Sequence, residues 1–226
     1  MGGVRLAVLI ILTLVLPPFR QPAAAGTTCP GDKGTTKLSV KRINGKISYK
    51  TGNTRSDLER IRQRHGATGA AVNGFPLGLT LSELRVEMRI STRAYPTSRG
   101  RYCSVPDRVN IDFGYPRFTI YIDRRYRRGS CEYRAISEHE ERHVAIYRQQ
   151  LDRLIYRVRK NMARAISRMA PLITASPNNG AERIKRRLSI KLAPLIRELQ
   201  RATDIGNRRI DSKINYIRVQ GRCRNW

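Results

Sequence analysis

A single apolar stripe constrains the fold of this chain more than any other feature of its sequence. Between residues 132 and 169, apolar side chains recur at steps of three or four residues, which is the spacing of one face of an α-helix. The stripe consists of Tyr133, Ile136, Tyr147, Leu151, Leu154, Val158, Met162, Ile166 and Met169. It predicts one long helix that buries this face and ends before Pro171, because proline cannot continue a helix.

Two histidines and a glutamate lie on the same stripe. His139, Glu140 and His143 form the pattern H-E-x-x-H, in which the two imidazoles are one helical turn apart and can share a metal ion. Zinc peptidases use this arrangement, with the glutamate as general base. The pattern therefore predicts one Zn²⁺ per chain, bound by His139 and His143, with Glu140 as the catalytic residue. Two interior histidines satisfied by hydrogen bonds are the alternative.

The chain also carries a large positive charge. Its 45 lysine and arginine residues outnumber its 17 acidic residues, which gives a formal net charge of +28. Such a charge favours anionic partners. The sequence contains no zinc-finger spacing, aromatic ribonucleoprotein signature or isolated basic tail, which argues against specific nucleic-acid binding. An anionic cell-envelope surface is the partner that the charge favours.

Residues 1–25 have the pattern of a secretory signal peptide. Arg5 precedes the apolar run Leu6–Leu16, and Ala23-Ala24-Ala25 forms a small-residue cleavage site. The run is shorter than the roughly 20 residues that span a bilayer, and no other stretch approaches that length. We therefore expect a secreted or periplasmic protein that does not span the membrane, with a single domain over residues 26–226.

The four cysteines predict two disulfides. None of them belongs to a Cys-x-x-Cys pair, and an even, widely spaced set in an exported protein favours disulfides over a metal cage. Four cysteines allow three pairings. We favour Cys103–Cys131, which would join a strand to the start of the motif helix, and Cys29–Cys223, which would join the two ends of the domain.

The order of the expected elements predicts an α+β fold, β-rich over residues 26–130 and helical over residues 131–226. Asn44-Gly45, between two segments of alternating polarity, predicts a β-hairpin. Further strands are expected over residues 84–90, 105–113 and 118–123. Together these segments predict a small antiparallel sheet that precedes the long helix.

Shorter helices are expected on both sides of the motif helix. Ser56 and Glu59 form a capping box that opens a helix ending at His65, and we expect His65 to cap that helix rather than bind metal. The glycine- and alanine-rich residues 67–78 are expected to form a loop. Two C-terminal helices are expected over residues 181–201 and 203–219. Proline at position 194 should kink or split the first of them.

The chain resembles a bacterial family of predicted secreted zinc-dependent proteases, a domain of unknown function with the same histidine motif. The specific part of the resemblance is the motif itself. The more general part is a hairpin and helix after the signal peptide, the strand near Cys103, the segment Cys131-Glu132-Tyr133, and the C-terminal Ile210-Asp211-Ser212, Asn215-Tyr216, Cys223 and Trp226. The resemblance implies a zincin-like fold, in which a sheet lies along the metal helix and its edge strand holds a peptide substrate.

The chain departs from this family at one possible ligand. Some relatives carry a Thr-x-His-Gly stretch that could supply a third metal ligand, whereas this chain has Thr203-Asp204-Ile205-Gly206. A third ligand must then come from His65 or from a carboxylate. The carboxylate candidates are Asp211 and Asp204, with Glu182 and Glu198 behind them.

Two functions follow from these patterns. The first is a secreted zinc metallopeptidase or hydrolase that acts on peptide or protein substrates, with Glu140 helping a metal-activated water to attack a peptide carbonyl. The second is a non-catalytic, basic envelope-binding protein whose metal site is structural or vestigial. The lack of an obvious third ligand is what keeps the second function open.

Overall fold

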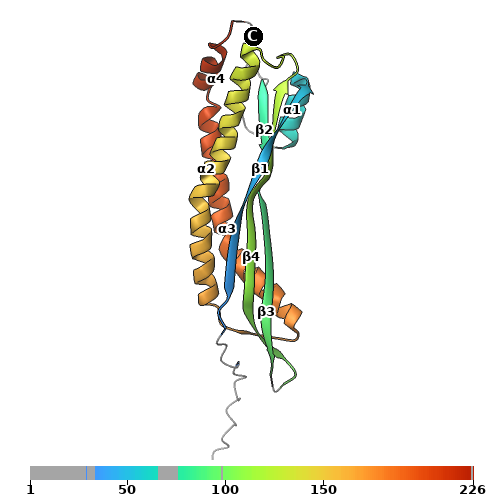
Figure 1. Ribbon diagram of the computed structural model, residues 1–226, viewed down its shortest axis with the longest axis vertical. Coiled ribbons are helices and arrows are strands. Elements are labelled where there is room, and N and C mark those ends of the chain that lie inside the picture. Colours follow the sequence, from blue (N-terminus) through green and yellow to red (C-terminus); the bar gives the residue numbers. More distant parts are fainter. Residues whose placement is uncertain (1–28, 30–33, 66–75, 98, 225) are drawn as a thin grey trace, which may run out of the picture.

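The computed structural model describes residues 29, 34–65, 76–97, 99–224 and 226, and this part of the chain has an α+β fold with a mixed five-stranded sheet and four helices (Figure 1). The predicted α+β class is confirmed. The predicted signal peptide and most of the predicted loop at residues 67–78 lie outside the described residues. In chain order the elements are β1 (Lys37–Asn53), α1 (Arg55–Arg64), β2 (Gly78–Ser82), β3 (Arg85–Pro96), β4 (Tyr102–Asp123), α2 (Cys131–Ser167), β5 (Leu172–Thr174), α3 (Pro177–Ile210) and α4 (Lys213–Gln220).

The sheet is built around β4, a strand of 22 residues. Strand β1 pairs with one edge of β4 in parallel, and β2 and β3 pair with it in antiparallel orientation along the other edge. The short strand β5 completes the sheet at the start of β4. The prediction of an antiparallel sheet is therefore wrong for β1, because β1 finds its partner far along the chain rather than in its neighbour.

The predicted hairpin at Asn44-Gly45 is also wrong. Strand β1 runs straight through these residues, and Asn44 pairs with Tyr115 in the continuous parallel register. A Cβ atom at Gly45 would lie 2.1 Å from the carbonyl oxygen of Pro116. Glycine is required at position 45 because the two backbones approach closely there, and not because the chain turns.

The strands predicted at residues 105–113 and 118–123 are two parts of β4, while the strand predicted at residues 84–90 lies almost entirely within β3. Val109, Ile111 and Phe113 are buried at odd positions, and burial moves to even positions from Phe118 onward. Gly114 lies at this change of phase with a φ of 148°, a conformation that glycine adopts without steric cost. A single strand therefore has the appearance of two in the sequence.

Helices α2 and α3 lie side by side and pack against the sheet along its length (Figure 1). Helix α2 has 37 residues and bounds close to the predicted 132–169. The apolar stripe faces the core, where Leu151, Val158 and Met162 are almost completely buried. Each such side chain contributes roughly 1.5–3 kcal/mol through burial, so the stripe anchors the helix firmly.

Helix α1 begins two residues earlier than the predicted capping box implies, and it has a different cap. The side chain of Thr54 accepts a hydrogen bond from the backbone of Asp57, and the Asp57 carboxylate accepts one from the backbone of Thr54. This reciprocal pair replaces the predicted capping box of Ser56 and Glu59. His65 occupies the C-cap position, as predicted.

The two predicted C-terminal helices have different bounds in the structure. Helix α3 begins at Pro177, where Ser176 caps its start and the missing proline N–H costs nothing. The helix continues through Pro194 to Ile210, so the proline does not split it. None of the helices in the described part of the chain combines the length and apolar character needed to cross a bilayer.

Two disulfides are present, but the predicted pairing is wrong. Cys29 pairs with Cys103, and Cys131 pairs with Cys223. The first bond joins the segment before β1 to the start of β4, the strand beside it. The second forms because α4 runs back along the start of α2 and brings the C-terminus there (Figure 1).

Candidate metal centre

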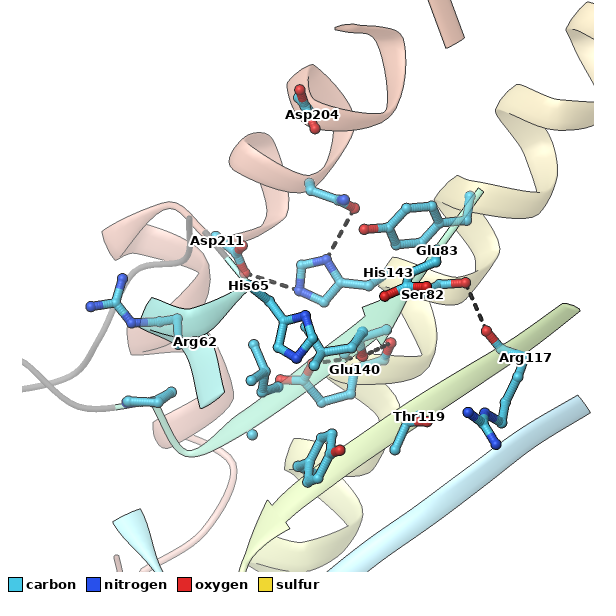
Figure 2. Close-up of a pocket in the computed structure, with 18 of the residues that line it drawn as sticks. Arg62, His65, Ser82, Glu83, Arg117, Thr119, Glu140, His143, Asp204 and Asp211 are labelled. Atoms are coloured by element: carbon cyan, nitrogen blue, oxygen red, sulfur yellow. Dashed lines mark hydrogen bonds and ion pairs between the residues drawn. The ribbon is translucent and has the colours of Figure 1, made fainter. Parts of the chain in front are cut away.

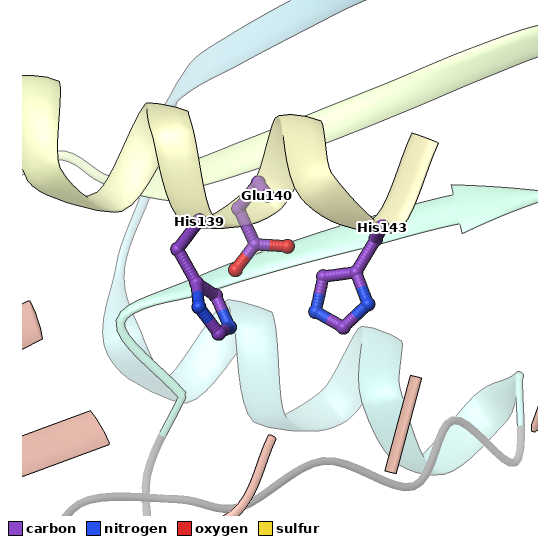
Figure 3. Close-up of side chains that lie close together, drawn as sticks. All are labelled: His139, Glu140 and His143. Atoms are coloured by element: carbon purple, nitrogen blue, oxygen red, sulfur yellow. The ribbon is translucent and has the colours of Figure 1, made fainter. Parts of the chain in front are cut away.

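Helix α2 presents the three motif residues on its buried face (Figure 3). His139, Glu140 and His143 are 4%, 2% and 7% exposed, and the two imidazole centroids are 5.1 Å apart. One nitrogen or oxygen atom from each of the three lies within 4.8 Å of the others. A His-Glu-His cluster of this size could hold a metal ion.

Asp211 brings a second carboxylate to the two histidines from the C-terminal end of α3. Its Oδ1 atom lies 3.2 Å from Nε2 of His139 and 3.0 Å from Nε2 of His143. Two ligands of a tetrahedral zinc ion, each about 2.0–2.1 Å from the metal, lie roughly 3.3 Å apart. Each Nε2 atom is therefore as far from the carboxylate oxygen as one zinc ligand is from another.

The other predicted ligands do not reach the two imidazoles. Asp204 lines the neighbouring cleft but forms no ion pair with either histidine. Glu198 pairs instead with Arg157, and Glu182 is exposed near the other end of α3. His65 caps α1 and also lines the cleft, a location that sequence reasoning did not predict.

Asn207 is a site residue that sequence reasoning missed. Its side-chain oxygen lies 3.1 Å from Nδ1 of His143 and accepts a hydrogen bond from Nδ1–H, an orientation of the ring in which Nε2 meets Asp211. A Cβ atom at Gly206 would lie 2.7 Å from Ile146, so glycine there lets α3 approach α2 closely. The sequence did contain one feature that could have pointed to Asn207. It precedes Asp211 by four residues, so on a helix the two side chains lie on the same face.

Strand β2 holds Glu140 from the other side. The hydroxyl of Thr80 lies 2.8 Å from Oε2 of Glu140 and donates a hydrogen bond to it. A Cβ atom at Gly78 would lie 2.8 Å from Oε1 and 2.7 Å from Ile136, so only glycine fits here without displacing the glutamate. These contacts were missed because the sequence predicted no strand at residues 78–82.

The charges of the cluster depend on one another. Burial raises the pKa of Glu140, although the nearby charges of His143 and His139 oppose the shift. Burial also acts to raise the pKa of Asp211, but hydrogen bonds from His139 and His143 more than reverse this and lower it. Burial alone would lower the pKa of His143, but its contacts with Asp211 and Glu140 raise it to about 9. The buried cluster therefore stabilises positive charge between its carboxylates.

A cleft of about 540 Å³ opens beside the cluster (Figure 2). Strand β2 forms one wall, and Glu140, His143 and Asp211 line the interior. Its remaining walls carry tyrosines, arginines and a histidine. These include Tyr147, Tyr216, Arg62, Arg117 and His65. The carboxylate of Glu140 is thus accessible to a molecule bound along β2, even though the residue itself is almost fully buried.

Comparison with known proteins gives no relative for this chain. No family model matches the sequence, and neither curated proteins nor solved structures give a significant match.

Proposed function

We propose that this protein is a secreted zinc metallopeptidase with a zincin-like site, in which His139, His143 and Asp211 bind one Zn²⁺ and Glu140 is the general base. The observation that carries the proposal is the position of Asp211 Oδ1, 3.2 Å and 3.0 Å from the two Nε2 atoms. The family of predicted secreted zinc-dependent proteases, which the sequence resembles, would have the same activity. Nitrogen and carboxylate donors suit zinc, since its protein sites use these atoms.

Zinc in this position would act as a Lewis acid toward a peptide carbonyl and would lower the pKa of a nearby water molecule. Glu140 would accept the proton from that water through Oε1, because Oε2 is held by Thr80. The raised pKa of Glu140 favours this role, since the carboxylate accepts a proton more readily than an exposed glutamate would. Glu140 would then pass the proton to the leaving amine.

An extended peptide fits the arrangement of the cleft. Among the described residues β2 pairs with β4 alone, which leaves the other edge of β2 along the cleft. A peptide could add to that edge through main-chain hydrogen bonds, as in strand addition. Its carbonyl groups would then pass Glu140, whose partner Thr80 belongs to the same strand.

The two disulfides support an oxidising compartment, which agrees with the predicted signal peptide and with a secreted or periplasmic location. The net charge of +28 would hold the protein near anionic cell-envelope material through long-range attraction. Both statements are parts of the same proposal.

A non-catalytic envelope-binding protein remains the competing function. It was motivated by the lack of an obvious third ligand beside His139 and His143. The contact of Asp211 with both histidines weakens that motive, and the opening of the cleft onto Glu140 favours catalysis.

The metal site is tested by measuring the zinc content and zinc affinity of the purified mature protein. We expect one zinc per chain, lost in the His139→Ala/His143→Ala double variant. Asp211→Asn should weaken zinc binding strongly, while Asp204→Asn, a matched change in the same cleft, should leave it unaltered. Equal effects of the two aspartate variants would remove Asp211 as the third ligand.

Catalysis is tested separately with Glu140→Gln in a peptide-library cleavage assay. This variant should retain zinc and lose hydrolysis, because the amide cannot accept the proton. Cleavage by the wild type that persists unchanged in Glu140→Gln would contradict the mechanism. Zinc binding without cleavage of any peptide would favour the non-catalytic function.

A further inference from the structure

Tyr216 reaches the cleft beside the candidate metal centre from α4. This helix begins two residues after Asp211, and its first turn brings the ring of Tyr216 against that of His139, with the ring centroids 5.1 Å apart. Tyr216 is 7% exposed, and its side chain lines the cleft. The chain just after α4 is tied to the start of α2 by the disulfide Cys131–Cys223. Tyr216 is therefore a fixed part of the cleft wall next to the histidine pair.

The hydroxyl of Tyr216 has no hydrogen-bond partner among the residues that the structure describes. The polar side chains around it are paired with one another, as the contacts of Thr80 with Glu140 and of Asn207 with His143 show. The hydroxyl is not completely buried, so its hydrogen is open to the cleft that the residue lines. Such a hydroxyl is a good donor to a bound molecule, because no bond within the protein has to break when the new one forms.

The phenol of Tyr216 is a proton-bearing donor at neutral pH, because its ordinary pKa is about 10. Burial raises the pKa of Tyr216, and the charges of Glu140 and Asp211, which lie nearby, raise it further. Arg62, a cationic residue of the same cleft, is committed to Glu59 by hydrogen bonds of 2.8 and 2.7 Å. Tyr216 is therefore a donor that is both available and close to the carboxylates of the centre.

We propose that Tyr216 is a further catalytic residue, whose O–H donates a hydrogen bond to the carbonyl oxygen of the peptide bond that is cleaved. As the oxygen of water forms a bond to the carbonyl carbon, the carbonyl π electrons move onto the carbonyl oxygen and leave it negatively charged. The phenol stabilises this charge and keeps its own proton. The proton of the water passes to Glu140 and then to the leaving amine as the C–N bond breaks. This role rests on the proposed zinc-peptidase function.

Tyr216→Phe tests the hydroxyl separately from the ring, because it keeps the packing against His139 and removes only the O–H group. Loss of one donor to a developing oxyanion lowers kcat by about 10²–10³-fold, so we expect a fall of this size. KM, zinc affinity and the thermal unfolding temperature should stay close to those of the wild type, since the interaction forms only in the transition state.

Tyr126→Phe is the matched control. Tyr126 is 6% exposed and packs against the ring of Trp226 at 5.7 Å, but it is not among the residues that line the cleft. This variant should cleave peptides like the wild type. Equal losses of kcat in Tyr126→Phe and Tyr216→Phe would reduce the effect to a general loss of packing and overturn the catalytic role.

A second readout measures binding instead of turnover. A phosphinic peptide carries a tetrahedral group with a negatively charged oxygen in place of the cleaved bond, and it therefore resembles the transition state. Its affinity should fall in Tyr216→Phe by about the same factor as kcat/KM. An intact peptide should bind to Glu140→Gln equally well with and without Tyr216→Phe, because its carbonyl oxygen has not yet gained charge.

The outcomes separate this role from the proposed function. If the wild type binds zinc and cleaves peptides, and Tyr216→Phe does both equally well, the role of Tyr216 is wrong and the metallopeptidase proposal stands. If Tyr216→Phe weakens the binding of the phosphinic and the intact peptide alike, the hydroxyl contributes to ground-state binding only, which overturns the catalytic role. A wild type that binds zinc but neither cleaves peptides nor binds the phosphinic peptide would overturn the proposed function and the role of Tyr216 together.

Discussion

The side-chain oxygen of Asn207 lies 3.1 Å from Nδ1 of His143, and Asn207 precedes Asp211 by one helical turn on α3. Helix α3 thus supplies both the carboxylate that meets the histidine pair and the amide that orients one of the two rings. Since α2 carries the histidines, the geometry of the centre depends on how these two helices pack.

Asn207→Ala should lower zinc affinity by about 10–100-fold with little change in fold, because His143 would lose the hydrogen bond that fixes its tautomer and orientation. Chelator competition measures the change. Asn207→Asp retains an acceptor and should bind zinc at least as well as the wild type. Equal weakening in both variants would show that Asn207 contributes through packing alone.

Gly78→Ala should damage the site from the side of β2. The added Cβ atom would lie 2.7–2.8 Å from Ile136 and Glu140, so β2 or the glutamate must move. Overpacking of this kind costs about 1–3 kcal/mol, and peptide cleavage should fall with the displacement of Glu140. Thermal unfolding and the cleavage assay measure the two effects.

Gly52→Ala is the matched control for this change. A Cβ atom at Gly52 meets nothing within 4 Å, so stability and cleavage should both stay close to the wild type. If Gly78→Ala also behaved like the wild type, the close approach of β2 to Glu140 would not matter for function.

Zinc affinity should rise with pH well beyond the ordinary titration range of histidine. The contacts of His143 raise its pKa to about 9 in the metal-free protein, and a protonated imidazole cannot bind metal. Below that pH a proton competes with zinc, so affinity should increase about tenfold per pH unit up to roughly pH 9. Without the shift, the increase would level off near pH 6.5.

The measurement is chelator competition at several pH values, together with calorimetry in buffers of different ionisation enthalpy. Zinc binding at neutral pH should release protons to the buffer. A constant affinity above pH 7 and no proton release would show that His143 is neutral before zinc binds.

The two disulfides should affect the site differently. Either loss, Cys131→Ser/Cys223→Ser or Cys29→Ser/Cys103→Ser, should lower the free energy of unfolding by about 2–5 kcal/mol, because each bond closes a long loop. Only the first should also weaken zinc binding, since Cys131–Cys223 secures α4, which follows directly after Asp211. Cys103 lies near the start of β4, whereas β2, which contacts Glu140 through Thr80, pairs with the other end of that strand.

Chemical denaturation gives the unfolding free energies, and zinc competition under native conditions gives the affinities. Equal zinc affinity in the two double variants would show that α4 is held in place by its packing, without help from the disulfide.

The local elements could be predicted where the sequence pattern is long and regular. The stripe from Tyr133 to Met169 defines the buried face of α2, and the motif spacing alone places His139 and His143 one turn apart. Gly45 shows where such reasoning fails. Asn-Gly is a strong hairpin signal, yet here the glycine serves a close approach to Pro116, a contact that local sequence does not contain.

The sequence by itself determined the α+β class, the long α2 helix and the pair of histidines on one face, because these depend on the periodicity of nearby residues. Only the tertiary structure brought Asp211 rather than Asp204 against the two histidines, placed Asn207 and Thr80 beside the motif, paired Cys131 with Cys223 and set β1 parallel to β4. These contacts join residues far apart in the chain. They depend on the packing of α3, α4 and β2 around α2, and on distances that no local pattern in the sequence specifies.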